Sequence, residues 1–113
     1  MDKVIVENFA LTTLEELSHI PAVPYYEQNV ASYIKSICEG LNLQTQTDRY
    51  GNVLVSRIGT DIDANGTALV AHLDHPGFEA VEVDRGNIVG TMLGGLGQAA
   101  YAPGVAVLFV TND

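Results

Sequence analysis

The sequence has 113 residues, of which 47% are hydrophobic and 17% charged, and 14 acidic against 5 basic residues give a formal charge of −9. This composition excludes a highly charged disordered chain, and so few cations argue against nucleic acid as a partner. A single cysteine, Cys38, excludes an intrachain disulfide. With no signal-peptide pattern after Met1 and no apolar run of about 20 residues, we expect a cytosolic protein and no membrane partner.

The first predicted element is a helix over residues 8–20. Leucines recur there at helical spacing, and Thr12 with Glu15, or Thr13 with Glu16, fits a capping box. Pro21 would end it, because proline disfavours a helical residue before it. The following residues, Ile20 to Pro24, then form a stiff connector.

A second helix is predicted over residues 26–39. Glu27 would lie in its first turn, where a negative charge suits the helix dipole, and Gly40 would be the residue after its end. The predicted apolar stripe makes a buried structural thiol a better interpretation of the cysteine than a nucleophile. The stripe consists of Val30, Ile34, Ile37 and Cys38.

Two hairpins are predicted farther along the chain. From Leu43 the pattern changes to a period of two, and the turn signal Tyr50-Gly51-Asn52 leads into a returning strand, Val53 to Ile58. Phe78 to Val83 and Ile88 to Leu93 form the second pair, about the turn at residues 84–87.

Two further strands are predicted from continuous apolar runs. Thr67 to Leu73 suits a strand buried on both faces, as in an α/β sheet, and Val105 to Val110 suits another. Turn chemistry at residues 111–113 directly follows the last run. Because that strand would lack its partner, we expect the sequence to continue past Asp113 in the complete protein.

The strongest chemical signal is Ala71-His72-Leu73-Asp74, at the end of the predicted buried strand. Alternating strand side chains would place His72 and Asp74 on one face, at a sheet edge where ligands bind. A neutral imidazole there can ligate a metal, while a carboxylate holds its other ring nitrogen. The alternative is a strand end where His72 bonds locally and Asp74 starts a turn.

The sequence resembles the N-terminal part of the co-catalytic metallopeptidases, most closely the tetrahedral aminopeptidases, which are variously described as glutamyl aminopeptidases or endoglucanases. Three segments carry the resemblance: Ile20 to Ile34, then Asp48-Arg49-Tyr50-Gly51-Asn52-Val53, and Ala71-His72-Leu73-Asp74 with Gly77-Phe78. Their order and spacing agree with the family. The resemblance continues thinly through Gly94-Gly95 and Gly104-Val105, so that it spans nearly the whole chain.

The resemblance implies an α/β fold, with residues 1–75 starting a three-layer αβα catalytic domain and residues 76–113 starting an inserted β domain that mediates homo-oligomer assembly. It implies that His72 ligates one of two divalent metal ions, zinc first, with cobalt or manganese as alternatives. Asp74 would be the catalytic-site carboxylate that orients this histidine. The remaining ligands would follow residue 113. Peptides would be the substrates, cleaved at their N-terminal residue.

The sequence departs from the family at His75, where a glutamate is usual. This departure is compatible with a divergent or inactive member, so a non-catalytic assembly or binding protein on the same scaffold is the first alternative. A related metal-dependent deacylase or glycan hydrolase is another. The Pro76-Gly77 neighbours favour His75 as a solvated turn residue.

Other candidate residues have simpler interpretations. His19, at a helix end, is expected to pack or to cap the helix. Asp61 and Asp63 resemble the start of a calcium loop without its closing glutamate, and we expect a solvated loop. The glycines at residues 94–97 lack the lysine and the helix of a phosphate loop.

Overall fold

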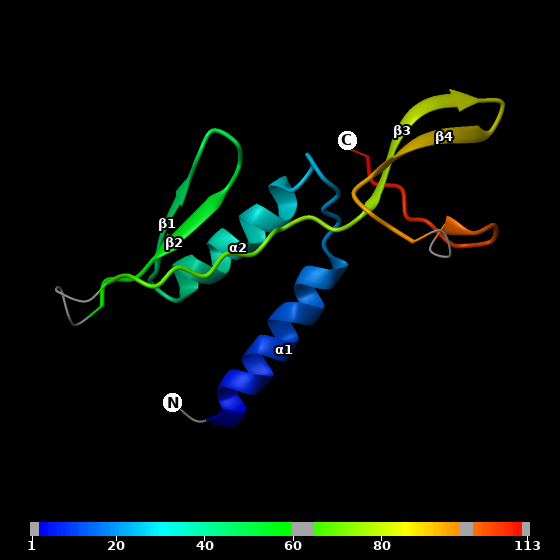
Figure 1. The fold of residues 1–113 in the computed structure, drawn as a ribbon. Coiled ribbons are helices and arrows are strands. Elements are labelled where there is room, and N and C mark those ends of the chain that lie inside the picture. The colour runs from blue at the N-terminus through cyan, green and yellow to red at the C-terminus, as the bar shows by residue number, and fades with distance from the viewer. Residues whose placement is uncertain (1–2, 60–64, 98–100, 112–113) are drawn as a thin grey trace.

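The computed structural model describes residues 3–59, 65–97 and 101–111. These residues form a mixed α/β structure of two helices and two separate two-stranded antiparallel sheets. The β1–β2 hairpin and the β3–β4 hairpin lie at opposite ends of the molecule, with an extended chain between them (Figure 1). The radius of gyration is 18.2 Å. A compact domain of this length would have about 13 Å, so the chain is markedly elongated.

Helix α1, Lys3–His19, begins earlier than the sequence predicts. The predicted capping box, at Thr12 or at Thr13, is wrong because α1 already runs through Val4 to Ala10, which puts both threonines in its interior. No residue of α1 is buried, and the predicted apolar face is largely exposed: Leu11 and Leu14 have 65% and 64% of their surface accessible. The helix therefore gains little from burial within the described residues.

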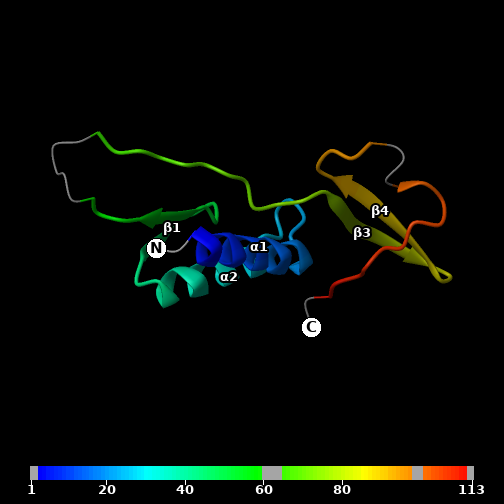
Figure 2. The same cartoon turned by 90° about the horizontal axis from the view of Figure 1, so that it is seen from below.

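Helix α2, Gln28–Gly40, carries most of the small core. Val30 and Cys38 of the predicted stripe are buried, whereas Ile34 and Ile37 are half-buried, so the stripe is confirmed in part and the thiol is buried as predicted. Ala31 is buried as well. Glu27 occupies the N-cap position, and its side chain accepts a bond from the Tyr25 backbone N–H without capping the helix. In Figure 2 α1 lies in front of α2, and a hydrogen bond from the Tyr33 hydroxyl to Glu16 links the two helices.

The end of α2 corrects the prediction that Gly40 follows the helix. Gly40 is its last residue, and the left-handed position two residues later is Asn42, at a φ of 54°. Asn42 N–H donates to Glu39 O and Leu43 N–H donates to Cys38 O. This is the Schellman pattern, which asparagine can support because its short polar side chain tolerates left-handed backbone.

The first hairpin is confirmed: β1, Gln44–Thr47, pairs antiparallel with β2, Val53–Ser56. The Asp48 carboxylate organises the turn. It accepts bonds from the backbone N–H groups of Tyr50 and Asn52, at 2.8 and 3.0 Å, and from the Asn52 side chain at 2.8 Å. Gly51 has a φ of 90°, a left-handed conformation that glycine adopts without a steric cost.

The second hairpin is also confirmed: β3, Gly77–Asp84, pairs antiparallel with β4, Asn87–Leu93. Arg85 and Gly86 both have positive φ, at 46° and 85°, as a two-residue type I′ turn requires. The register shifts between Ala80 and Glu82, where a bulge interrupts the ladder.

Both predicted apolar strands outside the hairpins are wrong for this structure. Residues 67–73 and 105–110 form no strand. Leu69 and Val70 are 96% and 95% exposed, the opposite of a strand buried on both faces. The physical reason is that a strand needs a neighbour for its backbone hydrogen bonds, and none is present for these segments among the described residues.

Candidate metal centre

His72 and Asp74 meet in the extended segment that leads from the first hairpin to β3. The His72 Nδ1 atom lies 3.2 Å from Asp74 Oδ1. An ionised carboxylate can only accept, so a neutral imidazole in this contact donates its Nδ1–H and carries the lone pair on Nε2. The His72 side chain is 81% exposed and that of Asp74 33%. The ring is therefore held on one side and open to solvent on the other.

This arrangement fits one ligand of a metal site. A neutral imidazole whose far nitrogen is fixed by a carboxylate is the usual form of a protein metal ligand. No group of three or more His, Cys, Asp or Glu side chains that could enclose an ion occurs in the described ranges. Among the described residues the pair is therefore one candidate ligand with a carboxylate beside it.

The chain just after this pair is tied to the connector between the helices. The backbone N–H of His75 donates to Ala22 O at 2.8 Å, and the His75 ring lies with Nε2 3.1 Å from Ile20 O. Ala22 is only 1% exposed. His75 is exposed, as predicted, but it lies in an extended segment rather than a turn, and its ring and backbone both bond to the connector.

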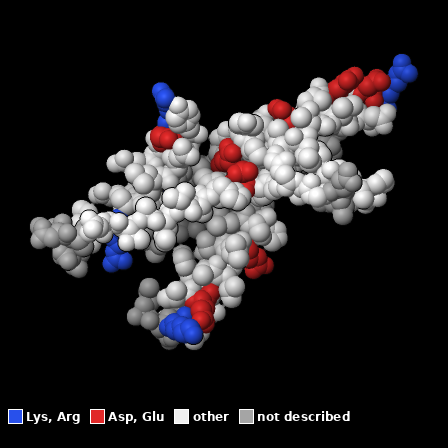
Figure 3. All heavy atoms as spheres, in the orientation of Figure 1, with Lys and Arg blue, Asp and Glu red and all other residues white. Residues whose placement is uncertain are grey.

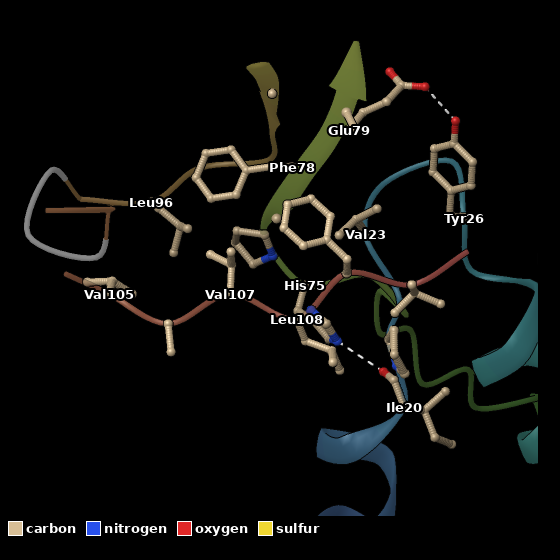
Figure 4. Close-up of a pocket in the computed structure, with 18 of the residues that line it drawn as sticks. Ile20, Val23, Tyr26, His75, Phe78, Glu79, Leu96, Val105, Val107 and Leu108 are labelled. Atoms are coloured by element: carbon tan, nitrogen blue, oxygen red, sulfur yellow. Dashed lines mark hydrogen bonds between the residues drawn. The ribbon is translucent and has the colours of Figure 1, made fainter. Parts of the chain in front are cut away.

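β3 adds two further links to the same connector. Tyr26 donates its hydroxyl to Glu79, a contact drawn in Figure 4, and this bond is the main cause that raises the pKa of Tyr26 above 10.0. Gly77 lies so close to Val23 that an added Cβ would fall 2.2 Å from a Val23 methyl carbon. We call residues 20–26 with residues 75–79 the connector junction.

A cavity of about 690 Å³ opens beside the connector junction. Its walls are mostly apolar, and Figure 4 shows the residues that face it from the connector, from β3 and from the C-terminal segment. The size and the lining suit a small ligand or a peptide side chain. Labelled lining residues include Val23, His75, Phe78, Leu96, Val107 and Leu108.

The remaining candidates are not brought to the pair. His19 Nδ1 lies 2.7 Å from Glu15 O, so its ring caps the end of α1, as predicted. Asp61 and Asp63 lie outside the described residues. Figure 3 shows the acidic side chains spread over several elements and the basic ones scattered near the extremities of the face in view.

Comparisons with protein-family models, with curated proteins and with solved structures found no match. The resemblance to the tetrahedral aminopeptidases therefore stays a prediction. In the described part of the chain, neither helix is long and apolar enough to cross a membrane.

Proposed function

We propose that this chain contributes the N-terminal portion of a dinuclear metal-dependent aminopeptidase, in which His72 binds one of two divalent ions, with zinc as the first candidate. The observation that carries the proposal is the 3.2 Å contact between His72 Nδ1 and Asp74 Oδ1 on an exposed ring. That contact leaves Nε2 as the one ring nitrogen available to a cation. The motif resemblance across the chain supports the reaction class.

Each residue of the pair has a separate role. His72 offers Nε2 to the ion, and Asp74 accepts the Nδ1–H, which fixes the ring orientation and raises its strength as a ligand. The bound ions would supply Lewis-acid polarisation of the peptide carbonyl and activation of a water molecule. The exposure of the ring provides the access that an incoming ion needs.

The proposal extends to the surrounding fold. Residues 1–75 would belong to a three-layer αβα catalytic domain, to which α1, α2 and the β1–β2 hairpin would contribute. Residues 76–113 would begin an inserted β domain through which copies assemble. The exposed apolar side chains of β3 and β4 favour such an interface: Phe78, Val81, Val83, Ile88, Val89 and Met92. We also propose that the protein acts in the cytosol.

The test uses the full-length protein with zinc supplied. Metal content by elemental analysis and hydrolysis of an aminoacyl anilide are measured for wild type, His72→Ala and Asp74→Asn. We expect His72→Ala to lose the ion at its position together with turnover, and Asp74→Asn to lose about 10–100-fold in zinc affinity or activity. The matched control is His19→Gln, which replaces a histidine that only caps α1 and keeps a side-chain donor.

The outcomes separate the alternatives. Unchanged metal content and turnover in His72→Ala would show that the assignment of His72 is wrong. A wild-type protein with neither bound metal nor turnover would favour the non-catalytic assembly protein on the same scaffold. Metal without aminopeptidase turnover, but with release of an acyl or glycosyl group, would favour the related hydrolases.

A further inference from the structure

The connector junction holds one residue by two bonds to two different carbonyls. The backbone N–H of His75 reaches Ala22 O at 2.8 Å, and its ring Nε2 reaches Ile20 O at 3.1 Å (Figure 4). The partners are more than fifty positions apart in the chain. Because both carbonyls belong to the short stretch that joins α1 to α2, His75 fixes where the extended segment meets the helices.

The ring bond defines the chemical form of His75. A backbone carbonyl oxygen can only accept, so the ring donates from Nε2 and carries its lone pair on Nδ1. His72 has the opposite arrangement, because its Nδ1–H is the group held by Asp74. The two histidines, three positions apart, are therefore expected in opposite tautomers.

We propose that His75 is a positioning residue that fixes the orientation of the adjoining His72–Asp74 pair by donating from its backbone and its ring to the connector. The proposal rests on the proposed function of His72 only for its effect on metal binding. Asp74 directly precedes His75, so the bond from the His75 N–H to the 1% exposed Ala22 sets the backbone position from which the carboxylate reaches His72. The ring bond adds a second point of attachment, which prevents rotation about the first.

This role gives a reason for histidine at a position where the resemblance predicts glutamate. An ionised carboxylate has no hydrogen to donate and would be repelled by the Ile20 carbonyl oxygen. Glutamine has the shape and length of glutamate but carries an N–H₂ donor. His75→Glu and His75→Gln therefore form a pair of equal length that differs in the donor and in one negative charge.

The experiment measures the His72 ring by ¹⁵N NMR in the metal-free, histidine-labelled full-length protein, with far-UV circular dichroism as the check on folding. We expect the Nδ1–H form of His72 to persist in His75→Gln and to be lost to averaged tautomers in His75→Glu. The zinc affinity, measured by chelator competition, should stay near wild type in His75→Gln and fall about 10–100-fold in His75→Ala, which lacks the donor and adds no charge.

Each result decides one claim. Identical His72 ring signals in His75→Glu and His75→Gln would overturn the positioning role. If the ring signals differ as expected but wild type binds no zinc, the positioning role holds and the proposed function fails. If His75→Glu does not fold, the wild-type spectrum decides alone: His75 must show Nε2–H and His72 Nδ1–H, and any other assignment overturns the proposal.

Discussion

A methyl group added at Gly77 is expected to open the connector junction. In Gly77→Ala the new Cβ would fall 2.2 Å from a Val23 methyl carbon, whereas ordinary contact begins at 3.4 Å. Either the Val23 side chain must leave its rotamer or one of the two segments must move, and the bond from His75 N–H to Ala22 O lies directly beside the clash. Overpacking of this kind costs about 1–3 kcal/mol.

The destabilisation of the connector junction can be measured locally by hydrogen exchange at the His75 amide. A cost of about 1–3 kcal/mol corresponds to roughly 5- to 150-fold faster exchange through local opening. Gly95→Ala is the matched control, because no atom lies within 4 Å of the added Cβ and no positive φ is involved. In Gly95→Ala we expect the free energy of local opening at the His75 amide to stay within about 0.5 kcal/mol of its wild-type value.

A second substitution tests the steric cause. Val23→Ala removes the methyl groups that the new Cβ would meet. The double variant Val23→Ala/Gly77→Ala should therefore lose less local stability at the connector junction than the sum of the two single variants, by about 0.5–3 kcal/mol. Equal exchange rates at the His75 amide in Gly77→Ala and Gly95→Ala would refute the close approach. Simple additivity in the cycle would refute Val23 as its partner.

Two further predictions concern ionisable groups in the first half of the chain. The side-chain bond from Asn52, helped by backbone N–H donors, lowers the pKa of Asp48 below 3.8 and outweighs its partial desolvation. The turn should therefore keep its full stability above pH 3.8 and lose it as the pH falls through the lowered pKa. Asp48→Asn should remove this pH dependence in the NMR shifts of the turn amides; an unchanged acid transition would contradict the assignment. The bond to Glu16 is the first cause that raises the pKa of Tyr33 above 10.0, so this link between α1 and α2 contributes stability below pH 10.0 and loses it as the pH rises through the raised pKa. In an absorbance titration Tyr33 and Tyr26 should ionise above pH 10.0, and Glu16→Gln should lower the pKa of Tyr33 alone. Identical titration curves for wild type and Glu16→Gln would refute the contact between Tyr33 and Glu16.

The sequence predicts the locally determined elements well. Both hairpins are found where turn residues separate two predicted strands, because Asp48 and Gly51, or Arg85 and Gly86, satisfy their turns within a few residues. The stripe of α2 predicts its buried cysteine for the same reason. The start of α1 is missed, since a capping-box pattern at Thr12 is equally compatible with a helix interior.

Elements that depend on distant parts of the chain are not predictable in this way. An apolar run such as residues 67–73 becomes a strand only when another strand pairs with it, and the run itself does not specify that partner. The junction of His75 with Ile20 and Ala22 joins segments more than fifty residues apart, and no local pattern marks it. The departure from the glutamate that the resemblance predicts is the one signal that could have directed attention to His75.

For the His72–Asp74 pair, the local contact was predictable from the sequence, but its structural setting was not. The two-residue spacing of His72 and Asp74 predicts that their side chains share a side, and the 3.2 Å contact agrees with that. The expected setting at the end of a buried strand is wrong for this structure, where the pair lies in an extended and exposed segment. The short spacing alone is enough to form the contact.

Anomalous diffraction at the zinc absorption edge, from crystals of the full-length protein grown with zinc, tests the central claim most directly. The account predicts an anomalous peak about 2.0–2.1 Å from Nε2 of His72, with Nδ1 facing Asp74. A zinc peak that is ligated by other residues, with the His72 ring free of metal, would contradict it.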